Sequence, residues 1–110
     1  MTFDEYQRLA ARTINKDLYE KEQLQHAIYG MCSEIGELQG IYQKAFQGHE
    51  IDEEHLKKEL GDLLWFANEY CTSQGWVMDE IAEMNIDKLR KRYPEGFREE
   101  GSLNRAEGDI

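Results

Sequence analysis

Two pairs of acidic residues, each three positions apart in a helix-compatible run, constrain this chain more than any other feature of its sequence. The pairs are Glu34 with Glu37, and Glu59 with Asp62. Residues at this spacing share one helix face, so each pair places two carboxylates side by side. Gly48, a helix breaker, and Asp52, a good N-cap residue, lie between the two runs,. We therefore expect the runs to fold back as a helical hairpin that brings the four carboxylates together.

Converging carboxylates favour a bound cation, because like charges at close range repel and raise one another's pKa. Mg²⁺ prefers oxygen ligands and commonly shares them with substrate phosphates. The pattern therefore predicts a metal-dependent enzyme that acts on a phosphorylated substrate. A net charge of −10 argues against duplex nucleic acid or an anionic membrane as a partner, since both attract basic surfaces,.

Hydrophobic periodicity predicts four helices and no strand. The expected helices cover about Thr2–Asn15, Glu22–Gln47, the run from Asp52 to Ser73, and Met78–Arg92. We expect an all-α fold in which a helical hairpin is joined by flanking helices, with Ile35, Tyr42 and Leu60 facing inward. Residues 1–97 form the expected domain, and the polar, glycine-containing residues 98–110 are expected to be a mobile C-terminal tail,.

The last long helix has a polar residue near the middle of its apolar side. This residue is Asn85, and the cations Lys88 and Arg92 flank it. An amide at a nominal core position beside two cations is typical of a ligand contact, although cations at a helix end also complement the helix dipole. Trp65 faces away from the core stripe of its helix, which fits either a stacked nucleobase or a subunit interface.

Cysteine usage and the absence of an apolar span favour a cytoplasmic protein. Cys32 and Cys71 lie on apolar faces and are expected to be buried free thiols,. The N-terminal residues lack the basic and apolar regions of a secretory signal, and no run is long enough to cross a bilayer. The three histidines have no metal-ligand spacing and are expected to be ordinary surface residues: His26, His49 and His55.

Three stretches carry a resemblance to a known family. They are Ser33–Leu38, Glu59–Trp65 and Asn85–Phe97. With these motifs, the chain from about Phe3 to Phe97 resembles the MazG-like members of the all-α nucleoside triphosphate pyrophosphohydrolase superfamily. The resemblance implies hydrolysis of a (deoxy)nucleoside triphosphate to a monophosphate and pyrophosphate. It also implies a homodimer or homotetramer with a shared four-helix-bundle core, in which a second chain completes the nucleotide pocket.

The resemblance also implies roles for individual residues. The expected Mg²⁺ ligands, for which Mn²⁺ would substitute, are Glu34, Glu37, Glu59 and Asp62. Asn85 and Lys88 would contact the substrate, with Lys88 on a phosphate, and Arg92 and Trp65 are further candidates for substrate binding. Many members have a glutamate where this chain has Ser33, so the general base stays open, and a metal-activated water oriented by Glu34 or Glu37 is the simplest substitute.

Four other functions compete with this interpretation. Within the superfamily, the alternatives are a phosphoribosyl-ATP pyrophosphohydrolase and a pyrimidine-specific triphosphatase. A carboxylate-bridged redox bundle is disfavoured because such sites use Glu-x-x-His, whereas here the third residue after each first acid is Glu37 or Asp62,. A non-catalytic helical interaction module would use the acids only as surface charge.

Overall fold

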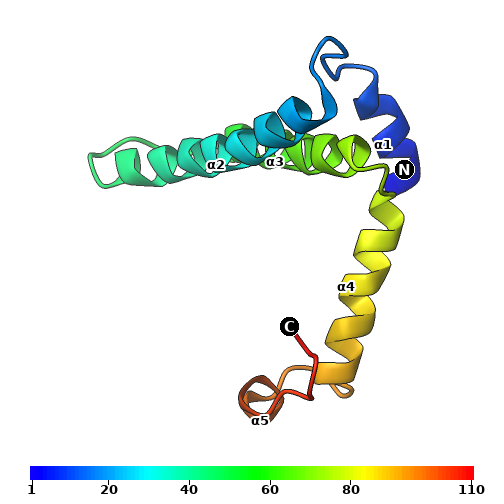
Figure 1. The fold of residues 1–110 in the computed structure, drawn as a ribbon. Coiled ribbons are helices and arrows are strands. Elements are labelled where there is room, and N and C mark those ends of the chain that lie inside the picture. Colours follow the sequence, from blue (N-terminus) through cyan, green and yellow to red (C-terminus); the bar gives the residue numbers. More distant parts are fainter.

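The computed structural model describes residues 1–110 and is built from five helices without a strand. The helices are α1 (Phe3–Ala11), α2 (Glu20–Ala45), α3 (Glu53–Ser73), α4 (Met78–Arg92) and α5 (Glu99–Leu103). Helices α2 and α3 run antiparallel as a long hairpin, and α1 crosses one end of it (Figure 1). The predicted all-α fold with a helical hairpin is confirmed.

The tight end of the hairpin follows from two local signals. Gly48 has φ 90°, a left-handed conformation that glycine adopts without steric cost, and it turns the chain after α2,. Asp52 then caps α3, because its side chain accepts a hydrogen bond of 3.0 Å from the backbone N–H of Glu54,. The predicted N-cap is confirmed, and the carboxylate runs face each other as a result.

Helix α1 fixes where α4 begins. It opens with the predicted capping box, in which Thr2 and Glu5 each accept from the other's backbone N–H,. Farther along, the Gln7 amide donates to the carbonyl oxygen of Trp76 at 2.8 Å. The Gln7 amide oxygen also accepts from the backbone N–H of Met78 at 2.8 Å. A single side chain thus satisfies groups at the start of α4 and ties α1 to that corner.

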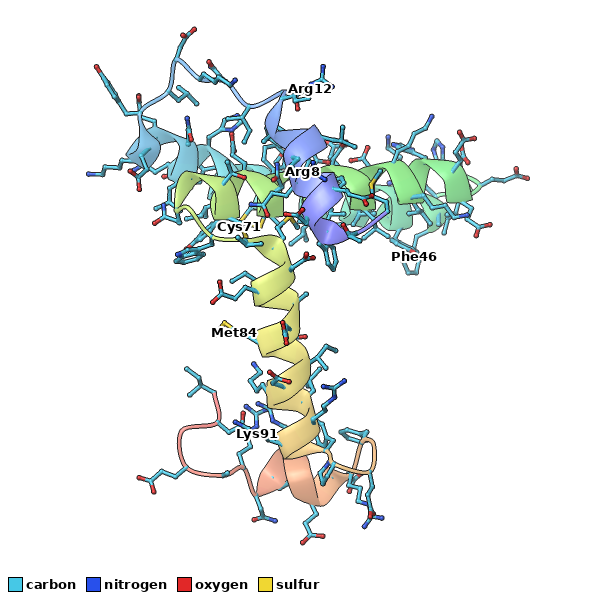
Figure 2. The ribbon with its side chains drawn as sticks, turned by 90° about the vertical axis from the view of Figure 1, so that its right-hand side faces the viewer. Arg8, Arg12, Phe46, Cys71, Met84 and Lys91 are labelled. Atoms are coloured by element: carbon cyan, nitrogen blue, oxygen red, sulfur yellow. The ribbon has the colours of Figure 1, made fainter.

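Helix α4 projects away from the hairpin, and α5 lies at its far end (Figure 1). Figure 2 shows Met84 and Lys91 at successive positions along this arm, well below the hairpin. The radius of gyration is 17.3 Å, whereas a compact chain of this length has about 13 Å. The single chain therefore has an open shape, in which α4 forms a projecting arm.

The single chain buries little apolar surface. Its buried hydrophobic residues are Ile14, Ala27, Cys71 and Met78. Ile35, Tyr42 and Leu60, which we expected to face inward, are each more than half exposed at 54%, 53% and 54%. That expectation is wrong for one chain, because a lone two-helix hairpin has no second layer to cover its outer face.

Both thiols are free, as predicted, and Cys71 is buried. The expectation of burial is wrong for Cys32, which is exposed on α2. None of the helices combines the length and the apolar composition needed to cross a membrane. The segment 98–110, expected to be a mobile tail, contains α5 and contributes an ion pair between Asp109 and Arg92 of α4.

Candidate functional site

Three of the four predicted carboxylates meet between α2 and α3. Glu34 of α2 and Glu59 and Asp62 of α3 each offer an oxygen that lies within 4.8 Å of the others. Glu37 is exposed one turn along α2 and lies outside this group. The hairpin therefore assembles a cluster of three acids, which we call the carboxylate cluster, with Glu37 beside it.

Crowding changes the ionisation of the cluster. The pKa of Glu34 is raised to about 7, first by a hydrogen bond with Glu59, then by desolvation, and then by the charges of Glu59, Asp62 and Glu37. Near neutral pH, Glu34 is therefore protonated part of the time, because its ionised form is repelled by the neighbouring acids,. A cation in the cluster would replace this proton and offset the repulsion.

Neighbouring side chains frame the cluster. His55 lies one turn before Glu59, and its Nε2 is 3.2 Å from the Glu59 carboxylate. Burial first, and then the charge of Asp62, raise the pKa of Tyr6 of α1. His55 is exposed on the surface, as expected, and in addition it contacts a cluster acid. Its i, i+4 spacing from Glu59 was the sequence signal that could have revealed the contact.

Trp65 joins α3 to the segment after α1. Its indole N–H donates to the hydroxyl of Thr13 at 2.8 Å, and its ring packs against Phe66 with the ring centroids 5.2 Å apart. The side chain is partly exposed. Trp65 therefore stands one turn beyond the cluster and keeps a free ring surface while its polar atom is satisfied.

A second polar pair lies farther along the hairpin. The Nδ1 atom of His26 is 2.7 Å and 3.0 Å from the two oxygens of Glu69, whose side chain is fully buried. Asn68 beside it is also fully buried, and its Nδ2 has no hydrogen-bond partner. His26 is exposed, as expected, but it is not an ordinary surface residue, since it pairs with a buried carboxylate 43 residues away. Glu69 is seven residues after Asp62 and shares its face, which was the only signal in the sequence.

The predicted residues of α4 do not join the cluster of their own chain. Asn85 is exposed and Lys88 is half-buried on the projecting arm. Arg92 is held by Asp109, with its Nε and Nη2 atoms donating to the two carboxylate oxygens at 2.8 Å and 2.7 Å. The acidic and the cationic candidates thus lie in separate parts of one chain.

A comparison with known families covers both the acidic and the cationic candidates. The sequence model of the MazG nucleotide pyrophosphohydrolase domain matches residues 20–97, from the start of α2 past the end of α4. The chain belongs to this family. The match spans both acidic pairs and the cations of α4, as the resemblance indicated. A comparison with curated proteins gave no match, and neither did a comparison with solved structures.

The cluster of this MazG domain fits a hard divalent cation. Its donors are all carboxylate oxygens, and they lie close enough to share one ion,. The raised pKa of Glu34 shows that the acids are crowded before any cation binds. Carboxylate oxygens are the ligands that hard cations prefer, and the one imidazole beside the cluster, that of His55, contacts Glu59,.

Proposed function

We propose that this MazG domain hydrolyses (deoxy)nucleoside triphosphates to monophosphate and pyrophosphate in a Mg²⁺-dependent reaction, with Mn²⁺ as a substitute. The observation that carries the proposal is the carboxylate cluster of Glu34, Glu59 and Asp62, assembled from the two acidic motifs of the family. A phosphorylated substrate would be repelled by these acids alone, so we expect binding to depend on the metal.

We assign the roles as follows. Glu34, Glu59 and Asp62 hold the metal, and Glu37 approaches from the adjacent turn of α2 as a further ligand. When bound, Mg²⁺ offsets the charge of the phosphates and lowers the pKa of the attacking water. Because Ser33 cannot act as an acid–base group, Glu34 or Glu37 orients that water and receives its proton.

The cations of α4 act, in this proposal, on the cluster of a second chain. Asn85 and Lys88 stand on an arm that leads away from the cluster of their own chain. An arm that reaches a neighbouring hairpin would bring Lys88 to a phosphate and Asn85 to the nucleoside, with Arg92 close behind. A cation at a phosphate is most effective where water is excluded, which a subunit junction provides.

The exposed apolar residues support a homodimer or homotetramer with a four-helix-bundle core. Ile35 and Leu60 of the hairpin and Ile81 and Ile86 of α4 are all between 42% and 54% exposed. Exposed apolar surface of this extent typically marks an interface. Two hairpins packed face to face would bury the first pair, and the arms would bury the second.

A panel of nucleoside triphosphates with Mg²⁺, assayed by a method that resolves pyrophosphate from orthophosphate, tests the proposal. Release of pyrophosphate in one step, abolished by EDTA, is expected. Stepwise release of orthophosphate, or unchanged turnover in EDTA, would refute it. Including phosphoribosyl-ATP and pyrimidine nucleotides separates the two narrower alternatives. A non-catalytic module would show no response to Mg²⁺ with any nucleotide.

A further inference from the structure

A cationic pocket lies at the far end of α4, although the chain as a whole has a net charge of −10. This pocket has a volume of about 600 Å³ and lies between α4 and the segment 101–110. Its cations are Lys88, Lys91, Arg92 and Arg105, and its acids are Asp87, Glu107 and Asp109. Figure 2 shows Lys91 on this part of the arm. The pocket thus has more cations than acids although the chain as a whole is acidic. Without Asp109 this excess of positive charge would be larger.

Asp109 is bound by one of these cations. It forms the two-atom contact with Arg92 described above, and the two side chains are only 9% and 12% exposed. The pKa of Asp109 is lowered first by its hydrogen bond to Arg92 and then by the charges of Arg92, Arg105 and Lys88. Arg92 thus contacts Asp109 directly, and Lys88 and Arg105 line the same pocket.

The segment that carries Asp109 is closely seated against α4. At Gly101, an added Cβ would lie 2.6 Å from the backbone oxygen of Arg92 and 3.0 Å from the ring of Tyr93. Only glycine permits this approach, so α5 packs directly on the last turn of α4. After α5 the chain turns back towards α4 (Figure 1, red). Asp109 is thus presented to Arg92 by a short strap that spans residues 101–110.

We propose that this pocket is a binding site for a diphosphate or triphosphate group, and that Asp109 is a built-in competitor for it. A guanidinium fork binds carboxylate and phosphate oxygens with the same two-atom geometry. A polyphosphate carries more charge and more oxygens than one carboxylate, so it can use Lys88 and Arg105, which line the same pocket, in addition to Arg92. Opening of the strap exchanges one anion for the other.

The anion site does not require the proposed function, but its regulatory consequence does. If Lys88 and Arg92 contact the substrate of a neighbouring chain, Asp109 competes with the triphosphate for Arg92. The strap would then raise KM and leave kcat unchanged. The phosphate group could belong to the substrate or to free pyrophosphate. Competitive inhibition of hydrolysis by pyrophosphate would identify the substrate's own site, and non-competitive inhibition would identify a separate effector site.

Calorimetric titration with inorganic pyrophosphate in EDTA tests the anion site without the carboxylate cluster taking part. A strap that is open in only about 0.1–10% of molecules lowers the apparent affinity for pyrophosphate in the same proportion. Asp109→Asn removes the ion pair that keeps the strap closed, so it should tighten pyrophosphate binding about tenfold or more. Glu107→Gln is the matched control, because it removes the same charge from the same pocket without touching Arg92. We expect it to change affinity less than about twofold, given screening by salt.

Arg92→Lys completes the test, because it keeps the charge and loses the fork. It should weaken pyrophosphate binding in the Asp109→Asn background. Unchanged or weaker binding by Asp109→Asn alone would overturn the proposal, since Asp109 would then only hold the strap. Equal gains from Asp109→Asn and Glu107→Gln would overturn it too. These titrations are decisive even if no nucleotide is hydrolysed, so failure here is distinct from failure of the proposed function.

Discussion

The raised pKa of Glu34 predicts a specific dependence of stability on pH. Its folded-state pKa is about 7, above the ordinary value of 4.5, because of the hydrogen bond with Glu59, desolvation and neighbouring charges. When the folded state raises the pKa of a carboxyl group in this way, folding favours the protonated form of that group. Its favourable contribution is complete below about pH 4.5 and is lost as the pH rises through about 7,. In the absence of metal, the cluster therefore weakens the fold at pH 8 relative to pH 5.

The size of the effect follows from the shift. A displacement from 4.5 to about 7 corresponds to about 3 kcal/mol at full value,. Glu34 is partly exposed, so water screens much of this interaction, and we expect about 1 kcal/mol,. Substituting Glu34→Gln removes the ionisation. In EDTA, the variant should melt about 4 °C above the wild type at pH 8 and within about 1 °C of it at pH 5.

Thermal unfolding of both proteins at one concentration, with EDTA or Mg²⁺, measures this difference. Glu50→Gln is the control, because Glu50 is an exposed loop acid away from the cluster. Mg²⁺ should raise the melting temperature of the wild type at pH 8 and raise that of Glu34→Gln much less. The reasoning is refuted if Glu34→Gln and the wild type differ equally at both pH values, or if Glu50→Gln behaves like Glu34→Gln.

Three further predictions concern single side chains. Asp62→Asn should lower kcat by about 100-fold or more, as expected for removal of a charged group that stabilises a transition state, with unchanged helical circular dichroism; near-normal turnover would mean that the acid is surface charge. Lys88→Ala should lower kcat/KM at least about tenfold more than Arg90→Ala, because Arg90 is exposed and pairs only with Asp87 at 3.6 Å; equal small losses in parallel kinetic assays would assign both cations to the helix end. His26→Ala should destabilise the fold by about 1–3 kcal/mol in urea unfolding, since it leaves the fully buried Glu69 without its partner,; an unchanged midpoint would show that water satisfies that carboxylate.

The helices could be predicted because their signals are local. The capping box at Thr2, the cap at Asp52 and the turn at Gly48 each depend on residues within a few positions. Helix α4 was predicted with the bounds it has, Met78–Arg92, because Pro94 stops it from the outside,. Three cluster acids converge because helical spacing places them on facing sides.

Apart from the local contact of His55 with Glu59, the features that were missed depend on distant parts of the chain. The buried carboxylate of Glu69 is tolerated only because His26 reaches it from the other helix. The direction of α4 is set by Gln7, which binds both sides of the corner before this helix. The contact of Arg92 with Asp109 joins a helix to a segment that had no periodic pattern. No spacing rule along the sequence encodes such pairs.

The proposed association would explain both the open shape of the chain and the separation of the α4 cations from the carboxylate cluster. The hairpin leaves Ile35 and Leu60 exposed on the two helices that carry the carboxylate cluster. The arm leaves Ile81 and Ile86 exposed on the helix that carries Lys88. A partner that covers both surfaces would supply the missing core and, in the same step, bring cations to acids. The stability of the helices and the completion of the site would then depend on one interface. The metal cluster of each chain would gain its substrate contacts only when the chains associate and bury these apolar residues.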